Sequence, residues 1–549
     1  MAKFNLSRIY WFIPVLVIGI FLMGASPTKA KFKIEPIGTY STGIFNESAA
    51  EISAYEPINQ RIFVINGSTN KVDVLSIKNL NNPSFLFNLE LNSDGGSVNS
   101  IAYKNGIIAV AVANKVAQTP GKILFFNPEG ELLNSVTVGA LPDMVTFTPD
   151  GNKVLVANEG EPNQDYSIDP EGSVSIIDIS NGIKNPQVTT ADFSRFNTEI
   201  LDDSIKISGP NATVAQDLEP EYITVSEDSK TAWITLQENN AIAILDIETG
   251  QIEKLVGLGF KDYSQYQIDA SFFDGKINIA SYKNLFGIYQ PDTISSYIFQ
   301  GKTYLVTANE GDSREYGDYK EDELVGNLQL KPDAFFQPIP NDLEVTKILG
   351  KTEKDCSDKC VYEKLYTFGG RSFSIWDAEG NLVFDSGDDF EQITSEKFPD
   401  FFNSNNSKNN FDNRSNKKGP EPEGIAIGKI NGRIYALIGL ERIGGVMSYD
   451  ITDPNNAFFV DYVNNRNFLG DPNAGTAGDL GPEGLLFIDS SKSPIGKALL
   501  VVTNEVSGTT TIYSVESLSQ QGWVWAVLVL VLIIVVALVL LNRNFGSNK

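Results

Sequence analysis

The 549-residue sequence contains no histidine and only two cysteines. Without an imidazole, catalytic triads that pair serine or cysteine with histidine cannot form, and histidine-ligated zinc sites are excluded as well. Basic residues are also scarce, because 43 lysines and arginines face 69 acidic residues and leave a net charge of −26. Nucleic acid is therefore not expected as a partner, since phosphates require a basic surface. The acidic excess favours divalent cations as partners, or a solvated acidic surface outside a cell.

The two cysteines, Cys356 and Cys360, lie close together in the segment CSDKC. In an exported protein this spacing predicts a small local disulfide. A metal site at this pair is the weaker alternative, because no further thiol and no imidazole is present to complete the ligand shell.

The N-terminus has the order of a secretory signal peptide. Lys3 and Arg8 precede an apolar run over residues 9–23, and small residues follow it. We expect a signal peptide over residues 1–30, with an uncleaved membrane anchor as the alternative.

The C-terminus contains an uncharged apolar run over residues 523–541. A run of this length predicts a transmembrane helix. Basic residues follow it, so residues 542–549 are expected to be a cytoplasmic tail and residues 31–520 an extracellular body in a single-pass protein of the cell membrane.

Between these ends the sequence repeats one phrase, of which residues 141–178 are the clearest example. The phrase is Pro-Asp/Glu, a short apolar strand, a turn, a second strand that ends in an acidic residue, and a third strand after a glycine. Units of this size that consist of short strands are typical of β-propellers. We predict an all-β, seven-bladed β-propeller, with a β-sandwich as the alternative; the units begin near residues 52, 98, 141, 220, 291, 422 and 482.

Two segments interrupt this pattern. Residues 312–364 are predicted to be a polar insertion within the fifth unit, and the Asn/Ser-rich residues 401–418 a flexible loop. Loops on a rigid ring are expected to serve as lids or contact surfaces.

The acidic residues of the repeats fall into two sets. The first set begins the first strand of a unit and contains Asp143, Glu219, Glu221, Asp292, Glu421, Glu423 and Glu483. The second set ends the second strand and contains Glu159, Glu161, Glu238, Glu310, Asp312, Glu441 and Glu505. Because antiparallel neighbours return the chain to its starting edge, we expect both sets to converge at one mouth of a central channel.

Carboxylates that are gathered in this way repel one another unless a cation offsets their charge. Oxygen ligands suit Ca²⁺, so we predict one or more calcium ions at this mouth. The predicted ligands are Glu159, Glu161, Glu221, Glu238, Glu310, Asp312, Glu423, Glu441, Glu483 and Glu505. The alternative is that these acids cap loops and pair between blades.

The repeat phrases resemble the choice-of-anchor I family. The resemblance lies in LPDMVTFTPDGNKVLVANEGEP, in YQPD with TANEGDSREY, and in GPEPEGIA and GPEGLLF. It implies a β-propeller body that is similar to mesenchyme-specific cell surface glycoproteins, and some relatives are labelled alkaline phosphatase-like.

Three functions are compatible with these observations. The first is a surface binding module that holds divalent cations and contacts a glycan or a surface protein. The second is a calcium-dependent phosphoesterase, in which Arg314, Arg371 or Arg442 would hold phosphoryl oxygens. The third is a structural surface protein without enzymatic activity.

Overall fold

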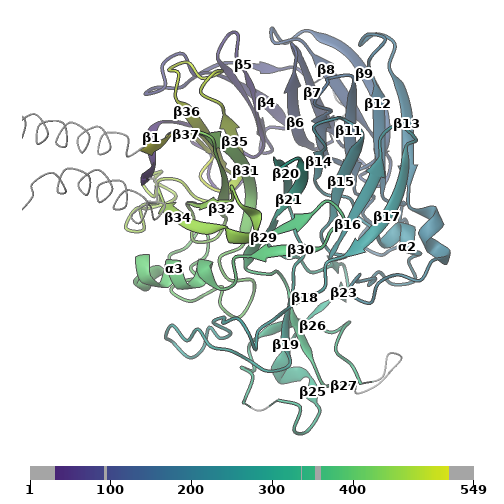
Figure 1. Ribbon diagram of the computed structural model, residues 1–549, viewed down its shortest axis with the longest axis vertical. Helices are drawn as coiled ribbons and strands as arrows, with labels where there is room; N and C mark the ends of the chain where they lie inside the picture. Colours follow the sequence, from purple (N-terminus) through teal and green to yellow (C-terminus); the bar gives the residue numbers. More distant parts are fainter. Residues whose placement is uncertain (1–30, 92–95, 336, 353–359, 519–549) are drawn as a thin grey trace, which may run out of the picture. The chain divides into compact units, whose positions relative to one another are not determined.

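A computed structural model describes residues 31–91, 96–335, 337–352 and 360–518. The chain divides into two compact units, one over Ile34–Val515 and one made of Met1–Lys33 and Glu516–Lys549. The description below concerns Ile34–Val515. In the described part of this unit, seven sheets have four strands each (Figure 1).

The first three of these sheets follow the chain without interruption, and all their neighbouring strands are antiparallel. The first consists of β2 (Ser53–Glu56), β3 (Arg61–Asn66), β4 (Lys71–Ser76) and β5 (Ser84–Leu89). The second consists of β6 (Val98–Lys104), β7 (Ile107–Val112), β8 (Pro120–Phe126) and β9 (Leu132–Ala140). The third consists of β10 (Pro142–Phe147), β11 (Lys153–Asn158), β12 (Ser173–Asp178) and β13 (Gln187–Asp192).

The next three sheets have the same order, although the fifth is interrupted. The fourth consists of β14 (Ile223–Val225), β15 (Thr231–Leu236), β16 (Ala241–Asp246) and β17 (Gln251–Gly257). The fifth consists of β20 (Ile294–Phe299), β21 (Lys302–Asn309), β29 (Ser372–Asp377) and β30 (Leu382–Asp385). The sixth consists of β31 (Pro422–Ile430), β32 (Arg433–Leu440), β33 (Val446–Asp450) and β34 (Phe458–Val463).

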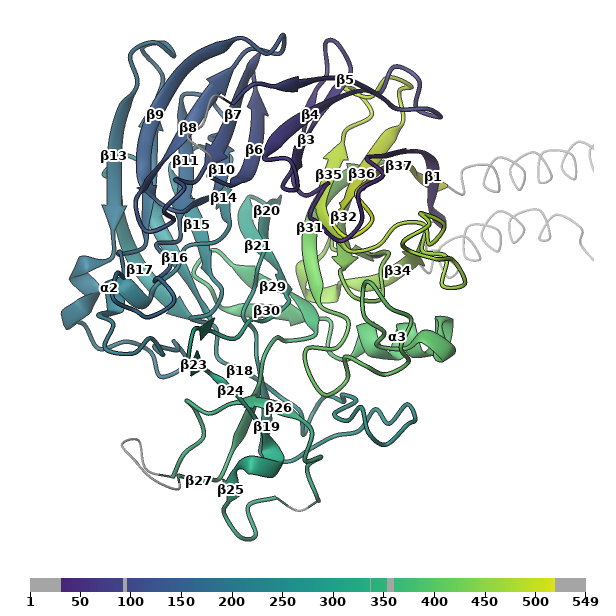
Figure 2. The same cartoon turned by 180° about the vertical axis from the view of Figure 1, so that it is seen from behind.

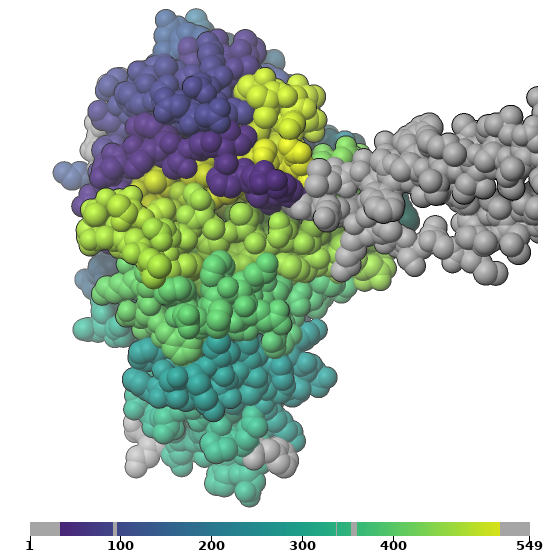
Figure 3. Space-filling view, turned by 90° about the vertical axis from the view of Figure 1, so that its left-hand side faces the viewer, coloured from purple at the N-terminus to yellow at the C-terminus, as the bar shows by residue number. Residues whose placement is uncertain are grey.

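The seventh sheet combines the two ends of the described chain. It contains β35 (Pro482–Ile488), β36 (Ala498–Asn504) and β37 (Thr509–Leu518), and its outer strand is β1 (Lys31–Ser41). The hydroxyls of Thr39 and Thr511 lie 2.9 Å apart across this junction. Figure 3 shows the two ends of the colour range meeting on the surface. The last sheet therefore depends on the first strand of the fold.

The first strands of the seven sheets form a closed ring. Each contacts the next, in the order β2, β6, β10, β14, β20, β31, β35 and back to β2. Strands in the middle of a sheet are buried on both faces, as in β15, whose sequence TAWITL is almost continuously buried. The outer strand β13, with the sequence QVTTAD, is mostly exposed. This gradient is expected when twisted sheets pack face to face around an axis.

A smaller structure departs from the ring at the fifth sheet (Figure 2). It contains the three-stranded sheet of β18 (Phe260–Asp262), β19 (Leu285–Ile288) and β28 (Leu365–Thr367). Three strand pairs accompany this sheet: β22 (Glu315–Tyr316) with β23 (Tyr319–Lys320), β24 (Asp322–Leu324) with β26 (Glu344–Thr346), and β25 (Gln329–Leu330) with β27 (Val361–Tyr362). The structure has its own apolar cluster, which includes Tyr263, Leu343 and Leu365.

Helical segments are short throughout the described residues. They are α2 (Val214–Asp217), α3 (Asp389–Lys397), η2 (Ser194–Thr198), η3 (Val325–Asn327), η4 (Pro399–Phe401) and η5 (Pro454–Asn456). In this part of the chain, no helix has the length and apolar character that a bilayer crossing requires.

This finding corrects two sequence-based predictions. The predicted fold class included a transmembrane helix, and the predicted location was a single-pass membrane protein; neither is supported by the described helices. The predicted signal peptide (residues 1–30), membrane helix (523–541) and tail (542–549) lie outside the described residues. The described fold is all-β.

Candidate functional site

A shift in strand pairing at the start of the first strands orients acidic residues of the first set towards the channel. Strand pairing shifts register between Pro142 and Val145, and the corresponding shift follows Pro422 and Pro482. The residue after each proline is acidic, and a β-bulge redirects the side chains that it contains. The repeated Pro-acid phrase therefore encodes a bent strand start that carries a carboxylate.

The residue before the proline is conformationally unusual in three of the Pro-acid phrases. Leu141, Gln290 and Glu421 have φ values of 47°, 44° and 51°. A positive φ costs free energy and is therefore uncommon in residues other than glycine. Residues with this kind of strain are concentrated at functional sites. The same strained corner thus precedes the channel at three separate places in the chain.

The second strands end beside the residues that precede these prolines. In three sheets the amide of the acidic residue that ends the second strand donates to the carbonyl before the proline. The pairs are Glu159 with Leu141 (3.0 Å), Glu441 with Glu421 (2.9 Å) and Glu505 with Gly481 (2.8 Å). Both acidic sets accordingly lie at one end of the channel, which we call the acidic mouth.

The third and fourth sheets hold one part of this mouth. Glu221 forms side-chain hydrogen bonds with Asp143 and with Glu159. Burial and then the charge of Glu161 raise the pKa of Asp143 to about 7. Burial and then the charges of Asp143 and Glu161 raise the pKa of Glu159 well above its usual range. These carboxyl groups bind protons or a cation more readily than isolated ones do.

The fifth and sixth sheets hold the group best suited to a metal ion. Glu310, Glu423 and Glu441 each offer a carboxylate oxygen, and these oxygens all lie within 4.8 Å of one another. Glu423 Oε2 is buried and has no hydrogen-bond partner. Burial and then the charges of Glu310 and Glu483 raise the pKa of Glu423. Several oxygens at this separation can share a hard cation such as Ca²⁺ or Mg²⁺.

The ten predicted ligands form one electrostatically connected group. Glu238 links the two halves, because its charge raises the pKa of Asp143 on one side and of Asp312 on the other. Tyr316 donates a hydrogen bond of 2.8 Å to Glu161. In addition to burial, the charge of Glu505 raises the pKa of Glu483, and the charges of Glu310 and Glu483 raise the pKa of Glu423. The structure thus brings the predicted carboxylates together at the acidic mouth.

Basic side chains offset part of this charge around Glu421. Lys418 lies 3.2 Å from Glu421 Oε2 and 2.5 Å from Glu310 Oε1, and Arg442 lies 2.9 Å from Glu421 Oε2. Arg414 also donates to Glu421. Although burial opposes ionisation, the charges of Lys418, Arg442 and Arg414 hold the pKa of Glu421 well below its usual range. Glu421 is therefore a neutralised carboxylate rather than a free ligand.

The three candidate arginines have structural partners. Arg314 lies 2.9 Å from both Asp217 Oδ1 and Glu219 Oε2. Arg442 pairs with Glu421 and also lies 2.8 Å from Glu441 Oε1. The predicted role of these two in holding a phosphoryl group receives no support from these contacts.

Arg371 also has buried partners. It lies 2.8 Å from Glu391 Oε1 and donates to the carbonyls of Asp269, Ser415 and Lys417. Asn403 donates to the same Glu391 oxygen. Residues 401–418 therefore contribute buried groups to the arrangement that holds Arg371, which is itself 2% exposed.

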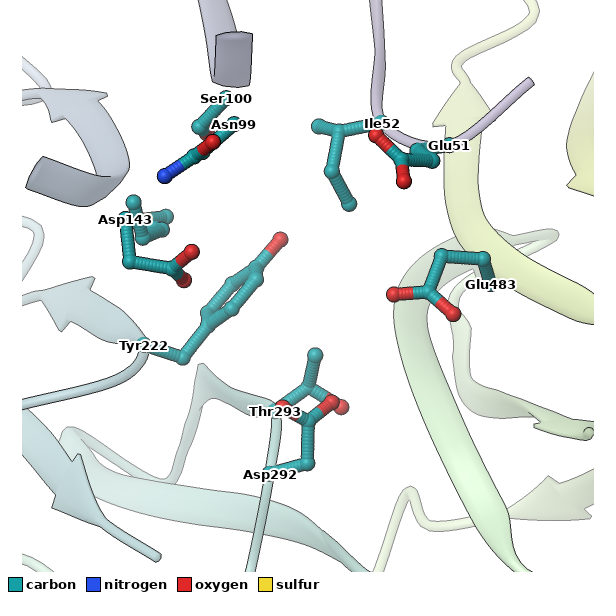
Figure 4. Close-up of a pocket in the computed structure, with 10 residues that line it drawn as sticks. Glu51, Ile52, Asn99, Ser100, Asp143, Tyr222, Asp292, Thr293 and Glu483 are labelled. Carbon is teal, nitrogen blue, oxygen red and sulfur yellow. The ribbon is translucent and has the colours of Figure 1, made fainter. Parts of the chain in front are cut away.

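A cavity of about 170 Å³ lies at the centre of the channel (Figure 4). Acidic residues from four sheets line it: Glu51, Asp143, Asp292 and Glu483. The hydroxyl of Tyr222 points towards the middle of this group. Burial and then the charge of Glu505 raise the pKa of Glu51 to about 7. We call this cavity the acidic chamber.

Sequence reasoning did not identify Glu51, Tyr222 or Lys418. Glu51 precedes the first strand of its sheet but lacks the neighbouring proline that marks five of the other six sheets. Tyr222 directly follows the Pro-Glu phrase, and Lys418 directly precedes Gly419 and Pro420. The position beside the Pro-acid phrase could therefore have identified Tyr222 and Lys418 from the sequence. Glu51 could be identified only once the ring of first strands was known.

Cys360 forms a disulfide. Its predicted partner, Cys356, lies outside the described residues.

Comparison with known proteins places this acidic propeller in a family. A model of the choice-of-anchor I domain matches residues 51–454. The chain belongs to the choice-of-anchor I family. The resemblance recognised in the repeat phrases is thereby confirmed. The matched range contains the first five sheets, three strands of the sixth, and most of the acidic mouth.

Two curated relatives are similar to this choice-of-anchor I chain. Gigasin-3a of Magallana gigas is 28% identical over 192 residues, which cover 33% of this chain and 68% of the relative. A mesenchyme-specific cell surface glycoprotein of Strongylocentrotus purpuratus is 28% identical over 285 residues, which cover 45% of this chain and 36% of the relative. The match thus spans about a third of the second relative's length.

Solved structures with a related fold include two distant examples. The WD40 domain of Toxoplasma gondii coronin has a TM-score of 0.46 and 8% identity, with 90% of this chain and 89% of that chain covered. Kuenenia stuttgartiensis hydrazine synthase has a TM-score of 0.44 and 11% identity, with 89% and 98% covered.

Proposed function

We propose that this protein is a cell-surface β-propeller that binds divalent cations at its acidic mouth. The observation that carries the proposal is the arrangement of Glu310, Glu423 and Glu441, whose oxygens lie within 4.8 Å of one another. The surface location is supported by the relative from Strongylocentrotus purpuratus, which is named as a cell surface glycoprotein. Contacts with other surface molecules are consistent with such a location.

The residues of this triad suit a hard cation. Carboxylate oxygens are the preferred ligands of Ca²⁺, and a bound ion would lower the repulsion that raises the pKa of Glu423. Lys418 contacts Glu310 Oε1, Gln237 donates to Glu310 Oε2, and Arg442 contacts Glu441 Oε1, so an ion would share these oxygens with their present partners or use Glu441 Oε2. Calcium is the first ion to test, and magnesium is the comparison because it demands a tighter octahedral shell.

Titration calorimetry of the purified full chain with CaCl₂ and with MgCl₂ tests this function. We expect saturable binding of at least one ion and an affinity at least tenfold lower in Glu423→Gln, because the variant loses an anionic ligand. Glu423→Gln is expected to remain folded, since it removes a carboxylate that is repelled by its neighbours.

Glu227→Gln is the matched control, because Glu227 is exposed in the turn between β14 and β15. It is expected to bind ions as the unaltered chain does. An unaltered chain that binds neither ion would contradict the proposal and leave a structural role for the acidic mouth. Equal affinities of Glu423→Gln and the unaltered chain would remove the triad from the site.

A further inference from the structure

Lys418 brings a positive charge into the acidic mouth. Its ammonium lies 2.5 Å from Glu310 Oε1 and 3.2 Å from Glu421 Oε2, and it donates to the carbonyl of Gly311 at 2.6 Å. These three acceptors match the three protons of an ammonium group. Asp312 Oδ1 lies 3.9 Å away. Two carboxylates and a carbonyl therefore form a cation site that the chain fills with its own side chain.

The backbone on both sides of Lys418 directs its side chain into the mouth. Arg371 donates to the carbonyl of Lys417 at 2.7 Å. Gly419 has a φ of 67°, which favours glycine. The side chain of Lys418 is 13% exposed, whereas that of Lys417 is 42% exposed and pairs with Glu344. Of these two neighbouring lysines, Lys418 is thus the one whose ammonium belongs to the acidic mouth.

The charge of Lys418 acts beyond its direct contacts. Burial raises the pKa of Glu310, Asp312 and Asp292, and the charge of Lys418 opposes this rise in each of them. Asp292 also lines the acidic chamber. Lys418 therefore reduces the repulsion among these carboxylates, which is the effect that a bound metal ion would have.

Glu310 belongs both to the Lys418 site and to the triad that suits a metal ion. Its Oε1 faces Lys418, and its Oε2 accepts a hydrogen bond of 2.8 Å from the buried Gln237. The other members of the triad are Glu423 and Glu441. An ion in the triad and an ammonium on Glu310 would be two cations on one carboxylate, and cations at such a separation repel each other. A metal ion and Lys418 consequently compete for Glu310.

This competition favours ions of higher charge. Exchange of the ammonium for Na⁺ or K⁺ leaves the charge of the mouth unchanged, and the tethered ammonium has the advantage of a high effective concentration. Exchange for Ca²⁺ or Mg²⁺ adds one positive charge to a group of carboxylates that repel one another. A divalent ion can therefore displace Lys418, whereas a monovalent ion gains nothing by doing so.

We propose that Lys418 determines which cations the acidic mouth accepts: its ammonium holds Glu310 when no metal ion is bound, gives way to a divalent ion, and excludes monovalent ions. This role rests on the proposed binding of divalent cations and names the residue that sets its affinity and selectivity. The displaced ammonium remains attached beside the site, so removal of the ion restores the contact with Glu310.

Titration calorimetry of the full chain with CaCl₂ tests the competition. We expect Lys418→Met to bind Ca²⁺ at least about tenfold more tightly than the unaltered chain, because the competing charge is lost. Lys418→Arg keeps the charge and should gain no affinity, and Lys417→Met is the matched control that should bind as the unaltered chain does. Equal or weaker binding by a Lys418→Met chain that circular dichroism shows to be folded would overturn the role of Lys418.

The same titrations separate this role from the proposed function. An unaltered chain that binds Ca²⁺ as tightly as Lys418→Met does would support the divalent-cation function and contradict the competition. An unaltered chain that binds no Ca²⁺, beside a Lys418→Met chain that binds it, would contradict the function and support the exclusion of cations by Lys418.

Titrations in KCl and in choline chloride of equal ionic strength test the selectivity. The unaltered chain is expected to bind Ca²⁺ equally well in both salts, because K⁺ does not displace Lys418. Lys418→Met should bind Ca²⁺ more weakly in KCl, because K⁺ can enter the position that the ammonium has left. Weaker Ca²⁺ binding of the unaltered chain in KCl, or no effect of KCl on Lys418→Met, would overturn the exclusion of monovalent ions.

Acetylation of lysine amines in the unaltered chain, measured by mass spectrometry, tests the displacement without a variant. In chelator, Lys418 should react more slowly than Lys417, because its ammonium is buried and engaged in hydrogen bonds. Saturation with CaCl₂ is expected to increase the acetylation of Lys418 several-fold and to leave that of Lys417 unchanged. Unchanged acetylation of Lys418, when calorimetry shows bound Ca²⁺, would overturn the displacement.

Discussion

Arg314→Gln is expected to destabilise the folded chain by about 3–5 kcal/mol. Arg314 lies 2.9 Å from Asp217 Oδ1 and from Glu219 Oε2, and its side chain is 1% exposed while both carboxylates are fully buried. It also donates to the carbonyl of Asp217 at 2.6 Å. The variant leaves two buried carboxylates without their cation, in a region where Glu238 and Glu161 already raise the pKa of Glu219.

Urea denaturation of the full chain measures this effect. Lys320→Gln is the control, because Lys320 and Glu315 are paired at 2.9 Å but are 59% and 49% exposed. An exposed pair of this kind contributes about 1 kcal/mol or less. The double variant Arg314→Gln/Glu219→Gln should recover part of the lost stability. A loss below about 1 kcal/mol in Arg314→Gln would show that the buried pairs are not needed.

The stability of the chain without divalent cations is expected to fall as pH rises from about 5 to about 8.5. Burial and neighbouring charges raise the pKa of Glu51 and Asp143 to about 7 and that of Glu441 to about 8. The folded state therefore holds protons that the unfolded state has already released. The stabilisation is complete below the unfolded pKa values near 4 and is lost as pH passes the raised values.

Thermal and urea unfolding in chelator at pH 5.5 and pH 8.5 measure this dependence. Glu51 alone should contribute about 2 kcal/mol of the difference, because its pKa rises to about 7 in the folded chain. Glu51→Gln is expected to reduce the pH dependence, because the amide does not ionise, and Glu227→Gln is expected to leave it unchanged. If the unaltered chain is equally or more stable at pH 8.5 than at pH 5.5 in chelator, the acidic mouth is neutralised by other means.

The repeated phrase allowed much of the channel to be predicted from sequence. Proline fixes φ, and the acidic residue after it enters a bulge, so the phrase produces the same shift in strand pairing at Pro142, Pro422 and Pro482. The convergence of Glu159, Glu423 and Glu505 follows because antiparallel strands return to the edge where they began. A short pattern with a local physical cause can be transferred from one sheet to the next.

Other features depend on contacts between distant segments, which no local pattern encodes. The partners of Arg314 lie in and beside α2, and the partner of Arg371 is Glu391 in α3. Sequence alone offered both arginines as candidates to hold phosphoryl oxygens but could not show that their guanidinium groups already have buried partners. Lys418 similarly became part of the mouth because the chain before β31 folds back over Glu310.

The membrane-helix prediction rested on the uncharged run over residues 523–541 and on the basic residues that follow it, and this segment lies outside the described residues. Among the described residues, no helix has the length and apolar character that a bilayer crossing requires. The propeller and its acidic mouth were predicted from a phrase that recurs along the chain, whereas the location was inferred from one apolar run and its flanking residues at each end of the sequence.

The pairing of β1 with β37 has a consequence for how the molecule is made. Thr39 and Thr511, which meet across this junction, are 472 positions apart in the chain. Each doubling of a closed loop costs about 0.6 kcal/mol in entropy, so this closure costs about 4 kcal/mol more than a hairpin turn of a few residues. During synthesis the first strand must wait, unpaired, until the final strands emerge. A nascent chain in which β37 is missing retains an exposed strand edge, and such an edge can be completed by the corresponding strand of another copy.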